Sequence, residues 1–321
     1  MRQLLRSLVV LAAAFFAVPA AAETYPARPI RLYVAFPPGG AADIVARLVA
    51  QALSARLGQP VVVENKPGSG GNIVGELIAH APPDGYSLLN GPDNLFTINP
   101  HLFAKMSFDP LKDIVPIATI TTNQLLLAIN PKVPARDFKE FIALAGRSDP
   151  ALFYASIGNG SVHHLAMEML KEEAAIKLTH VPYRGGGPAV VDLLAGQVQV
   201  YFGTFASTIE QVRAGKLRAL AVLSATRAAV LPDVPAVAEF IPGFEASIYV
   251  GIAAPRGTPA DIVDKLSATI GSALDDPGIR QRIAELGDTP LKLSAAEFTK
   301  LVAAETEKWA QVIRVSGVKA E

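Results

Sequence analysis

The sequence predicts an α/β protein, and three observations support this fold class. Short runs of β-forming residues alternate with amphipathic helical patterns along the 321-residue chain. Half of the residues are hydrophobic, which is enough to build a sizeable core. Several strand-like runs end in glycine-rich turns that pass directly into helices, as in parallel sheets whose ligands bind at the carboxyl ends of the strands.

The first 22 residues have the pattern of a secretory signal peptide. Arg2 and Arg6 precede an apolar run from Leu8 to Ala22, which ends in small residues before Glu23. This run is too short for a typical membrane-spanning helix, and the lack of cysteine excludes both lipid attachment at that residue and disulfides. We therefore expect a mature chain that is soluble in the periplasm, unlipidated and not inserted in a membrane.

Charge and motif content argue against several other classes of protein. The chain has 29 basic and 29 acidic residues, whereas a nucleic-acid-binding surface favours a basic excess, so no nucleic-acid partner is expected. Its first glycine turn is neither a P-loop nor a G-x-G-x-x-G dinucleotide fingerprint. His163 and His164 lack a third ligand at a spacing suited to zinc, so the sequence predicts no metal and no other cofactor.

The N-terminal part repeats the order strand, glycine turn and helix. Its predicted elements are a strand at 30–35, a turn at 36–42, a helix at 43–57, a strand at 61–65, a glycine turn at 66–72, a helix at 73–80, a strand at 86–90 and a turn at 91–94. Each strand therefore ends in a glycine turn, which places three such turns at one edge of the predicted sheet.

Two long apolar runs indicate that the chain forms two lobes. The run 117–129 is longer than a usual strand and can cross between two domains, and 247–254 would carry the chain back. We therefore expect a discontinuous first lobe, 23–124 with 248–321, and a second lobe, 125–247. The other predicted elements are helices at 137–147, 165–173, 189–195, 209–214, 259–274, 278–286 and 295–315, and strands at 153–156, 179–183, 198–202 and 217–223.

Two of the glycine turns are candidate anion sites. Phe36–Asp43 and Ser156–His164 each combine a glycine-rich turn with a helix start. Adjacent glycines let successive amides converge on one point, and the unpaired first-turn amides of a helix add partial positive charge. A carboxylate can therefore be held there without lysine or arginine. Such turns also occur for structural reasons alone, with Asp43 as a loop anchor and Ser161 as a helix cap.

Motifs along the whole mature chain resemble one bacterial family, the tripartite tricarboxylate transporter receptors, also called Bug receptors. The matching segments are Tyr-Pro-x-Arg-Pro-Ile-Arg at 25–31, Pro-Pro-Gly-Gly-x-x-Asp at 37–43, Pro-Gly-x-Gly-Gly-Asn at 67–72, Pro-Asp-Gly-Tyr at 83–86, Gly-Asn-Gly-Ser-x-x-His-Leu-Ala at 158–166, His-Val-Pro-Tyr-Arg-Gly at 180–185 and Leu-Pro-Asp-Val-Pro at 231–235. The resemblance implies a two-lobed type II periplasmic-binding-protein fold, a Venus flytrap with two crossing strands.

The resemblance also implies a function and a set of site residues. Family members are non-catalytic receptors that hold a small carboxylate between the lobes for a membrane permease, and they are typically monomers. Carried over to this chain, the candidate ligand-binding residues are Phe36, Pro38, Gly39, Gly40, Ala41, Asp43, Ser156, Gly158, Gly160, Ser161, His164, Tyr183, Gly185, Gly203 and Thr204. Many members have Asp-Asn in place of Gly203-Thr204; that aspartate pairs with an α-ammonium, so an amino-acid ligand is disfavoured here.

Two alternative functions stay open at this point. Ser161 and His164, with Asp43, suggest a periplasmic hydrolase, although the sequence has no G-x-S-x-G elbow around Ser161. The chain is also compatible with an orphan receptor that signals through a sensor protein and has no transport role. Di- and tricarboxylates and aromatic acids are all candidate ligands.

Overall fold

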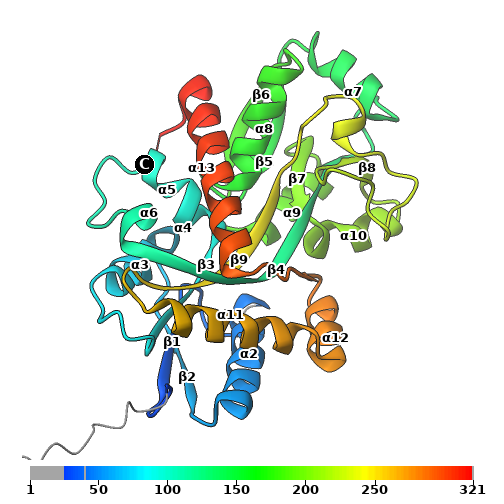
Figure 1. The fold of residues 1–321 in the computed structure, drawn as a ribbon. Coiled ribbons are helices and arrows are strands. Elements are labelled where there is room, and N and C mark those ends of the chain that lie inside the picture. The colour runs from blue at the N-terminus through cyan, green and yellow to red at the C-terminus, as the bar shows by residue number, and fades with distance from the viewer. Residues whose placement is uncertain (1–24, 40, 320–321) are drawn as a thin grey trace, which may run out of the picture.

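The computed structural model describes residues 25–39 and 41–319. The predicted signal peptide, 1–22, lies outside the described residues. The mixed α/β class is confirmed, and the strands join into one continuous ten-stranded sheet that runs through two lobes (Figure 1). Among the described residues, no helix is both long and apolar enough to cross a membrane.

The first lobe is built on a parallel core of three strands. Here β1 (Ile30–Val34) lies between β2 (Val61–Asn65) and β3 (Ser87–Pro92), and β9 (Ser247–Pro255) runs antiparallel beside β3. The remaining elements of this lobe are η2 (Ser69–Gly71), β10 (Thr289–Pro290) and the helices α2 (Ala41–Leu57), α3 (Asn72–Ala79), α4 (Asp93–Thr97), α5 (Asn99–Leu102), α6 (Pro110–Asp113), α11 (Ala260–Leu274) and α12 (Pro277–Glu285).

Side-chain alternation along β1 explains why helices cover both faces of this sheet. Ile30, Leu32 and Val34 point into a core shared with α2 and α11, whereas Tyr33 points into a second core with α3. Because both faces are covered by helices, the strand is apolar along most of its length rather than alternating between apolar and polar residues.

The long strand β4 (Ile114–Ile129) belongs to both lobes. Its residues up to Gln124 pair with β9, and those from Leu125 pair with β7 (Val200–Thr204) and β8 (Arg218–Val222). The second lobe also contains β5 (Leu152–Ser156), β6 (Leu178–Pro182), η3 (Val237–Glu239), α7 (Phe138–Ala145), α8 (Val162–Glu173), α9 (Gly186–Ala195) and α10 (Phe205–Arg213). In Figure 1, β4 and β9 are the two strands that pass between the lobes.

The C-terminal helix, α13 (Ala295–Ser316), packs against both lobes. Phe298 and Val302 lie in a core of the first lobe, with Tyr33 and β3 residues. Trp309 and Ile313, further along the same helix, lie in the core of the second lobe with residues of α7 and α8. Figure 1 shows the helix, coloured red, running from one lobe to the other beside β9.

The third glycine turn differs from its prediction. A turn is predicted at 91–94, but Gly91 and Pro92 complete β3 and Asp93 begins helix α4. Pro92 has extended backbone angles and precedes the first helical residue, and the hydroxyl of Thr97 donates to the Asp93 carbonyl within the helix. A proline followed by Asp-Asn suits a helix start as well as a turn, so the local sequence does not separate the two.

Candidate functional site

A cavity of about 890 Å³ lies between the lobes. It is lined by residues of both, with one residue from β9: Ala35, Phe36, Pro37, Pro67, Gly68, Ser69, Gly70, Gly71, Pro92, Asp93, Asn94, Asn99, Leu102, Phe103, Ile157, Gly158, Asn159, Gly160, Ser161, Val162, His163 and Ile248. None of these lining residues is lysine or arginine. An anion in this cleft would therefore be stabilised by backbone amides and side-chain dipoles.

The first-lobe loop is held by the buried carboxylate of Asp43. Its Oδ2 accepts hydrogen bonds from the Gly39 amide at 2.9 Å and from Arg47 Nε at 3.0 Å, and its Oδ1 accepts one from Asn65 at 2.7 Å. Asn65 also donates to the Phe36 carbonyl. Burial by itself would raise the pKa of Asp43, but the hydrogen bonds outweigh it and the pKa lies below its ordinary value. Asp43 is thus an anchor that fixes the loop where it meets the cleft.

The second glycine turn contributes more of the cleft wall than the first. Residues 68–71 all have positive φ, including Ser69 at 48°, which bends the backbone tightly around the cavity. The Gly70 carbonyl accepts hydrogen bonds from the side-chain amides of Asn94 and Asn99, and Asn99 also donates to Asn72 at 2.6 Å. These amides tie the turn to α3, α4 and α5, and so fix the cavity wall.

The second-lobe loop is held mainly by its own side chains. Ser161 caps α8: its Oγ accepts from the His164 amide at 3.3 Å and donates to the Gly158 carbonyl at 2.7 Å. Ser156 Oγ accepts from the Gly158 amide at 3.1 Å. His164 Nδ1 accepts from the Gly160 amide at 3.1 Å. The side chains of Ser156, Ser161 and His164 therefore shape the turn.

His164 lies in a stack of aromatic rings behind this loop. Its ring is 3.8 Å from that of His180, which in turn stacks on Tyr154. Burial, together with the charge of His180, lowers the pKa of His164 to about 4. The imidazole is therefore neutral at pH 7, which suits an acceptor of the Gly160 amide.

The two lobes touch where α5 meets the second-lobe loop. Gly160 has φ 71°, and a Cβ placed on it would lie 2.1 Å from Leu102 Cδ1. The close approach of these two chains therefore requires glycine on the second-lobe side.

The predicted site residues fall into three groups by position. Phe36, Gly158, Gly160 and Ser161 line the cavity. Outside its lining lie Pro38, Gly39, Asp43, Ser156, His164, Tyr183, Gly185, Gly203 and Thr204. The third group is Gly40 and Ala41: the structure does not describe Gly40, and it does not describe the side chain of Ala41.

Like Asp43, Ser156 and His164, two further residues outside the lining make structural hydrogen bonds. Tyr183 Oη donates to Asp192 at 2.7 Å. Thr204 caps α10 and accepts from the Ser207 amide.

Several lining residues were not among the predicted site residues. Ser69 and Gly70 belong to a glycine turn at the end of a parallel strand, so their position at the sheet edge was a usable signal. Asp93 directly follows the third strand at this edge, and His163 lies within the candidate loop Ser156–His164, so both carried the same kind of signal. Leu102 carries no such signal, because its place in the cleft depends on how the lobes meet.

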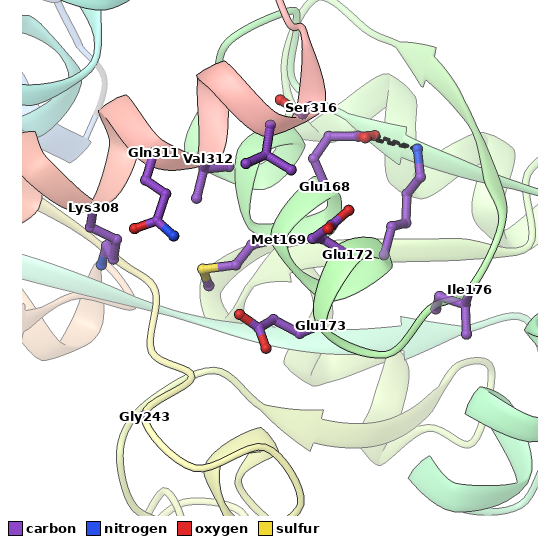
Figure 2. Close-up of a pocket in the computed structure, with 12 residues that line it drawn as sticks. Glu168, Met169, Glu172, Glu173, Ile176, Gly243, Lys308, Gln311, Val312 and Ser316 are labelled. Carbon is purple, nitrogen blue, oxygen red and sulfur yellow. Dashed lines mark hydrogen bonds and ion pairs between the residues drawn. The ribbon is translucent and has the colours of Figure 1, made fainter.

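A second pocket, of about 440 Å³, lies between α8 and α13, away from the cleft (Figure 2). Glu168, Glu172 and Glu173 are on its wall, and its two lysines are paired: Lys171 with Glu168 at 2.7 Å, and Lys308 with Glu305 at 2.6 Å. Because carboxylates dominate this pocket, the interlobe cleft is the more favourable place for an anion. The described residues also contain no cluster of three or more metal-binding side chains.

Comparisons with known proteins agree with this geometry. Residues 45–318 match the family described as the tripartite tricarboxylate transporter family receptor. Protein BugT of Bordetella pertussis is 36% identical over 313 residues, which cover 97% of this chain and 96% of BugT.

Two solved structures show the same fold. R. palustris Rpa4515 with adipate is 32% identical with a TM-score of 0.77, covering 92% of this chain and 99% of that one. MatC from Rhodopseudomonas palustris with bound malate is 34% identical with a TM-score of 0.73, and the match covers 90% of this chain and 100% of MatC. The resemblance and the fold predicted from the sequence are thereby confirmed, and the chain belongs to the tripartite tricarboxylate transporter receptor family.

Proposed function

We propose that this protein is a periplasmic receptor that captures a small carboxylate in its interlobe cleft for a tripartite tricarboxylate-type permease. The observation that carries the proposal is a cleft lined by two glycine turns and a helix N-terminus, with no lysine or arginine among its lining residues. The relatives solved with adipate and with malate support the carboxylate class. The protein is proposed to act as a monomer and without catalysis.

The ligand is proposed to close the two lobes by hinge bending at the crossing strands. The pairing partners of β4 change between Gln124 and Leu125, which supports lobe limits at 23–124 with 248–321, and 125–247. A ligand that bridges both lobes favours the closed form, because only that form brings both sets of amides to it.

The cleft-lining residues Phe36, Gly158 and Ser161 are the proposed first contacts. Further contacts proposed from the family motif are Pro38 to Ala41, Gly160, Tyr183 and Gly185. Asp43, Ser156 and His164 are proposed to shape the loops from behind, as their hydrogen bonds indicate.

Refolded, ligand-free protein is expected to show thermal stabilisation by one group of carboxylates. A ligand that binds only the folded state adds about 2.7 kcal/mol at 100-fold excess over Kd. The panel contains adipate, malate, tricarboxylates, aromatic acids, amino acids and sugars, measured by differential scanning fluorimetry. Unchanged melting temperatures with every carboxylate, but a rise with a sugar or an amino acid, would refute the carboxylate class.

Ser161→Ala is expected to weaken ligand binding only a few-fold. No hydrolase activity is expected in the wild type or in this variant. The Ser161 hydroxyl already donates to Gly158, and the His164 ring nitrogen Nδ1 is taken by the Gly160 amide. Asp43 lies in the first lobe, where its carboxylate accepts hydrogen bonds from Arg47 and Asn65. Ser161 and His164 lie in the second lobe, so the three residues are not arranged as a catalytic triad. Ester hydrolysis by the wild type that disappears in this variant would favour the hydrolase alternative.

Delivery to a permease and signalling through a sensor differ in the partner that is captured. Cross-linking of the liganded receptor in cells, followed by identification of the attached membrane protein, separates the two. We expect the permease, because the family to which the chain belongs serves that transporter.

A further inference from the structure

The wall of the interlobe cleft carries large apolar side chains from both lobes and from β9. These residues are Phe36, Leu102, Phe103, Ile157, Val162 and Ile248. Val162 is buried, whereas the other five are only half-buried and keep part of their surface accessible. A ligand with an apolar body gains free energy by covering such surface, because apolar groups of both partners then leave water.

Phe103 differs from the other five because no hydrophobic core accounts for it. Each of the other five lies in, or packs against, one of the hydrophobic cores. Among the residues that the structure describes, Phe103 belongs to none of the four cores. Its backbone is nevertheless fixed, because its amide donates to the Asn99 carbonyl at 3.0 Å where α5 ends. A half-buried aromatic side chain that lines a cavity and fills no core is a candidate ligand contact.

Three polar side chains of the wall already spend their donors within the protein. Asn94 uses both N–H groups of its side-chain amide, on the Gly70 carbonyl at 3.0 Å and on the Asn99 side-chain oxygen at 3.1 Å. Asn99 does the same, with the Gly70 carbonyl at 3.1 Å and the Asn72 side-chain oxygen at 2.6 Å. The hydroxyl hydrogen of Ser161 is used within its own loop. A hydroxyl group on a ligand would therefore give up its hydrogen bonds to water and find none of these donors in return.

The start of α8 still offers backbone amides to a carboxylate, close to the place where the lobes touch. The amides of Val162 and His163, in the first turn, have no intrahelical partner. A Cβ on Gly160 would lie 2.1 Å from Leu102 Cδ1, and Phe103 is the residue that follows Leu102. A carboxylate bound at this helix start can therefore extend its body along the wall to Phe103. The lining has no lysine or arginine, so each additional carboxylate on a ligand needs further amides of its own.

We propose that the cleft selects carboxylates with a hydrocarbon body, aliphatic or aromatic, over hydroxylated ones, and that Phe103 is the residue that packs against this body. The proposal rests on the proposed function of the cleft and names its ligand class. Contact with the apolar wall favours a hydrocarbon chain or ring, whereas each hydroxyl on it loses hydrogen bonds that the wall does not replace. Selection therefore comes from the body of the ligand, because the carboxylate is common to all candidates.

Isothermal titration of the refolded wild type with matched pairs of acids tests the ligand class. The pairs are adipate and galactarate, succinate and malate, and benzoate and protocatechuate; the second member of each keeps the carbon skeleton and the carboxylates and adds hydroxyls. In each pair that binds, the first member is expected to bind at least about tenfold more tightly. A hydroxylated member that binds as tightly as its partner, or citrate that binds more tightly than every hydrocarbon acid, would overturn the proposal.

Two substitutions at Phe103 test its part in the selection. Phe103→Ala removes the apolar contact and is expected to weaken binding of the tightest hydrocarbon acid of the panel roughly tenfold. Its hydroxylated partner is expected to lose less, so the preference between the two acids shrinks. Phe103→Leu keeps an apolar side chain and is expected to bind within about threefold of the wild type. Equal losses for both acids of a pair would mean that Phe103 does not select between them.

Melting temperatures and a control variant separate ligand contact from packing. Because Phe103 fills no core, ligand-free Phe103→Ala is expected to melt close to the wild type. Phe153→Ala is the matched control, since Phe153 on β5 is 41% exposed and does not line the cleft, and it is expected to leave the affinities unchanged. A large fall in melting temperature with an unchanged preference for hydrocarbon acids would assign Phe103 to packing alone. If the wild type binds none of the acids, the proposed function fails; if it binds them without regard to hydroxyls, only the proposed ligand class fails.

Discussion

Replacing Asp43 by alanine is expected to destabilise the protein by about 2–4 kcal/mol, because it leaves three donors without their buried acceptor. The donors are the Gly39 amide, Arg47 and the side chain of Asn65. Arg47 is half exposed and can turn to water, so most of the loss is expected from the other two. Urea unfolding of the ligand-free variant and wild type at pH 7 measures the difference.

The contribution of Asp43 to the free energy of unfolding should also depend on pH and should decrease in acid. Its pKa is lowered in the folded protein, so its contribution is complete above the unfolded pKa of about 4 and is lost as pH falls below that value. The difference between wild type and variant should therefore narrow below about pH 4. Glu307→Ala, which removes an exposed carboxylate on α13, is expected to change stability by less than about 0.5 kcal/mol. A comparably small change for Asp43→Ala would mean that the carboxylate does not anchor the loop.

The Gly160→Ala substitution is expected to impair both folding and binding, through two separable causes. Alanine at φ 71° costs about 1–2 kcal/mol in any state of the protein. The added Cβ also lies 2.1 Å from Leu102 Cδ1, so Leu102 must leave its rotamer or the lobes must stay apart. The second effect acts only when the lobes approach each other, and it is expected to weaken binding of the carboxylate that stabilises the wild type roughly tenfold.

A double substitution separates the two causes. Adding Leu102→Ala to Gly160→Ala is expected to restore most of the binding but none of the stability lost to backbone strain. Gly215→Ala is a control for that strain, since Gly215 has φ 68° and nothing within 4 Å of a Cβ. If Gly160→Ala and Gly215→Ala reduced binding equally, the contact with Leu102 would have no part in closure.

The sequence predicts local features of this protein better than those that depend on tertiary contact. The glycine turns and the helix cap at Ser161 follow from backbone preferences within a few residues, and Asp43 as a loop anchor follows from its place at a helix start. Asp93 follows a strand at the same edge, but the local sequence Pro-Asp-Asn does not distinguish a residue that lines a cleft from one that only starts a turn or a helix. Leu102 was missed because only the meeting of the two lobes places it in the cleft.

The packing of α13 has a consequence for the order in which the chain can fold. Each lobe lacks part of its core until this helix is in place, Phe298 on one side and the fully buried Trp309 on the other. Neither lobe can therefore complete its folding while the last residues are still being synthesised. A chain cut before residue 298 would expose both cores at once, and the two lobes should lose their structure in a single cooperative transition rather than one after the other.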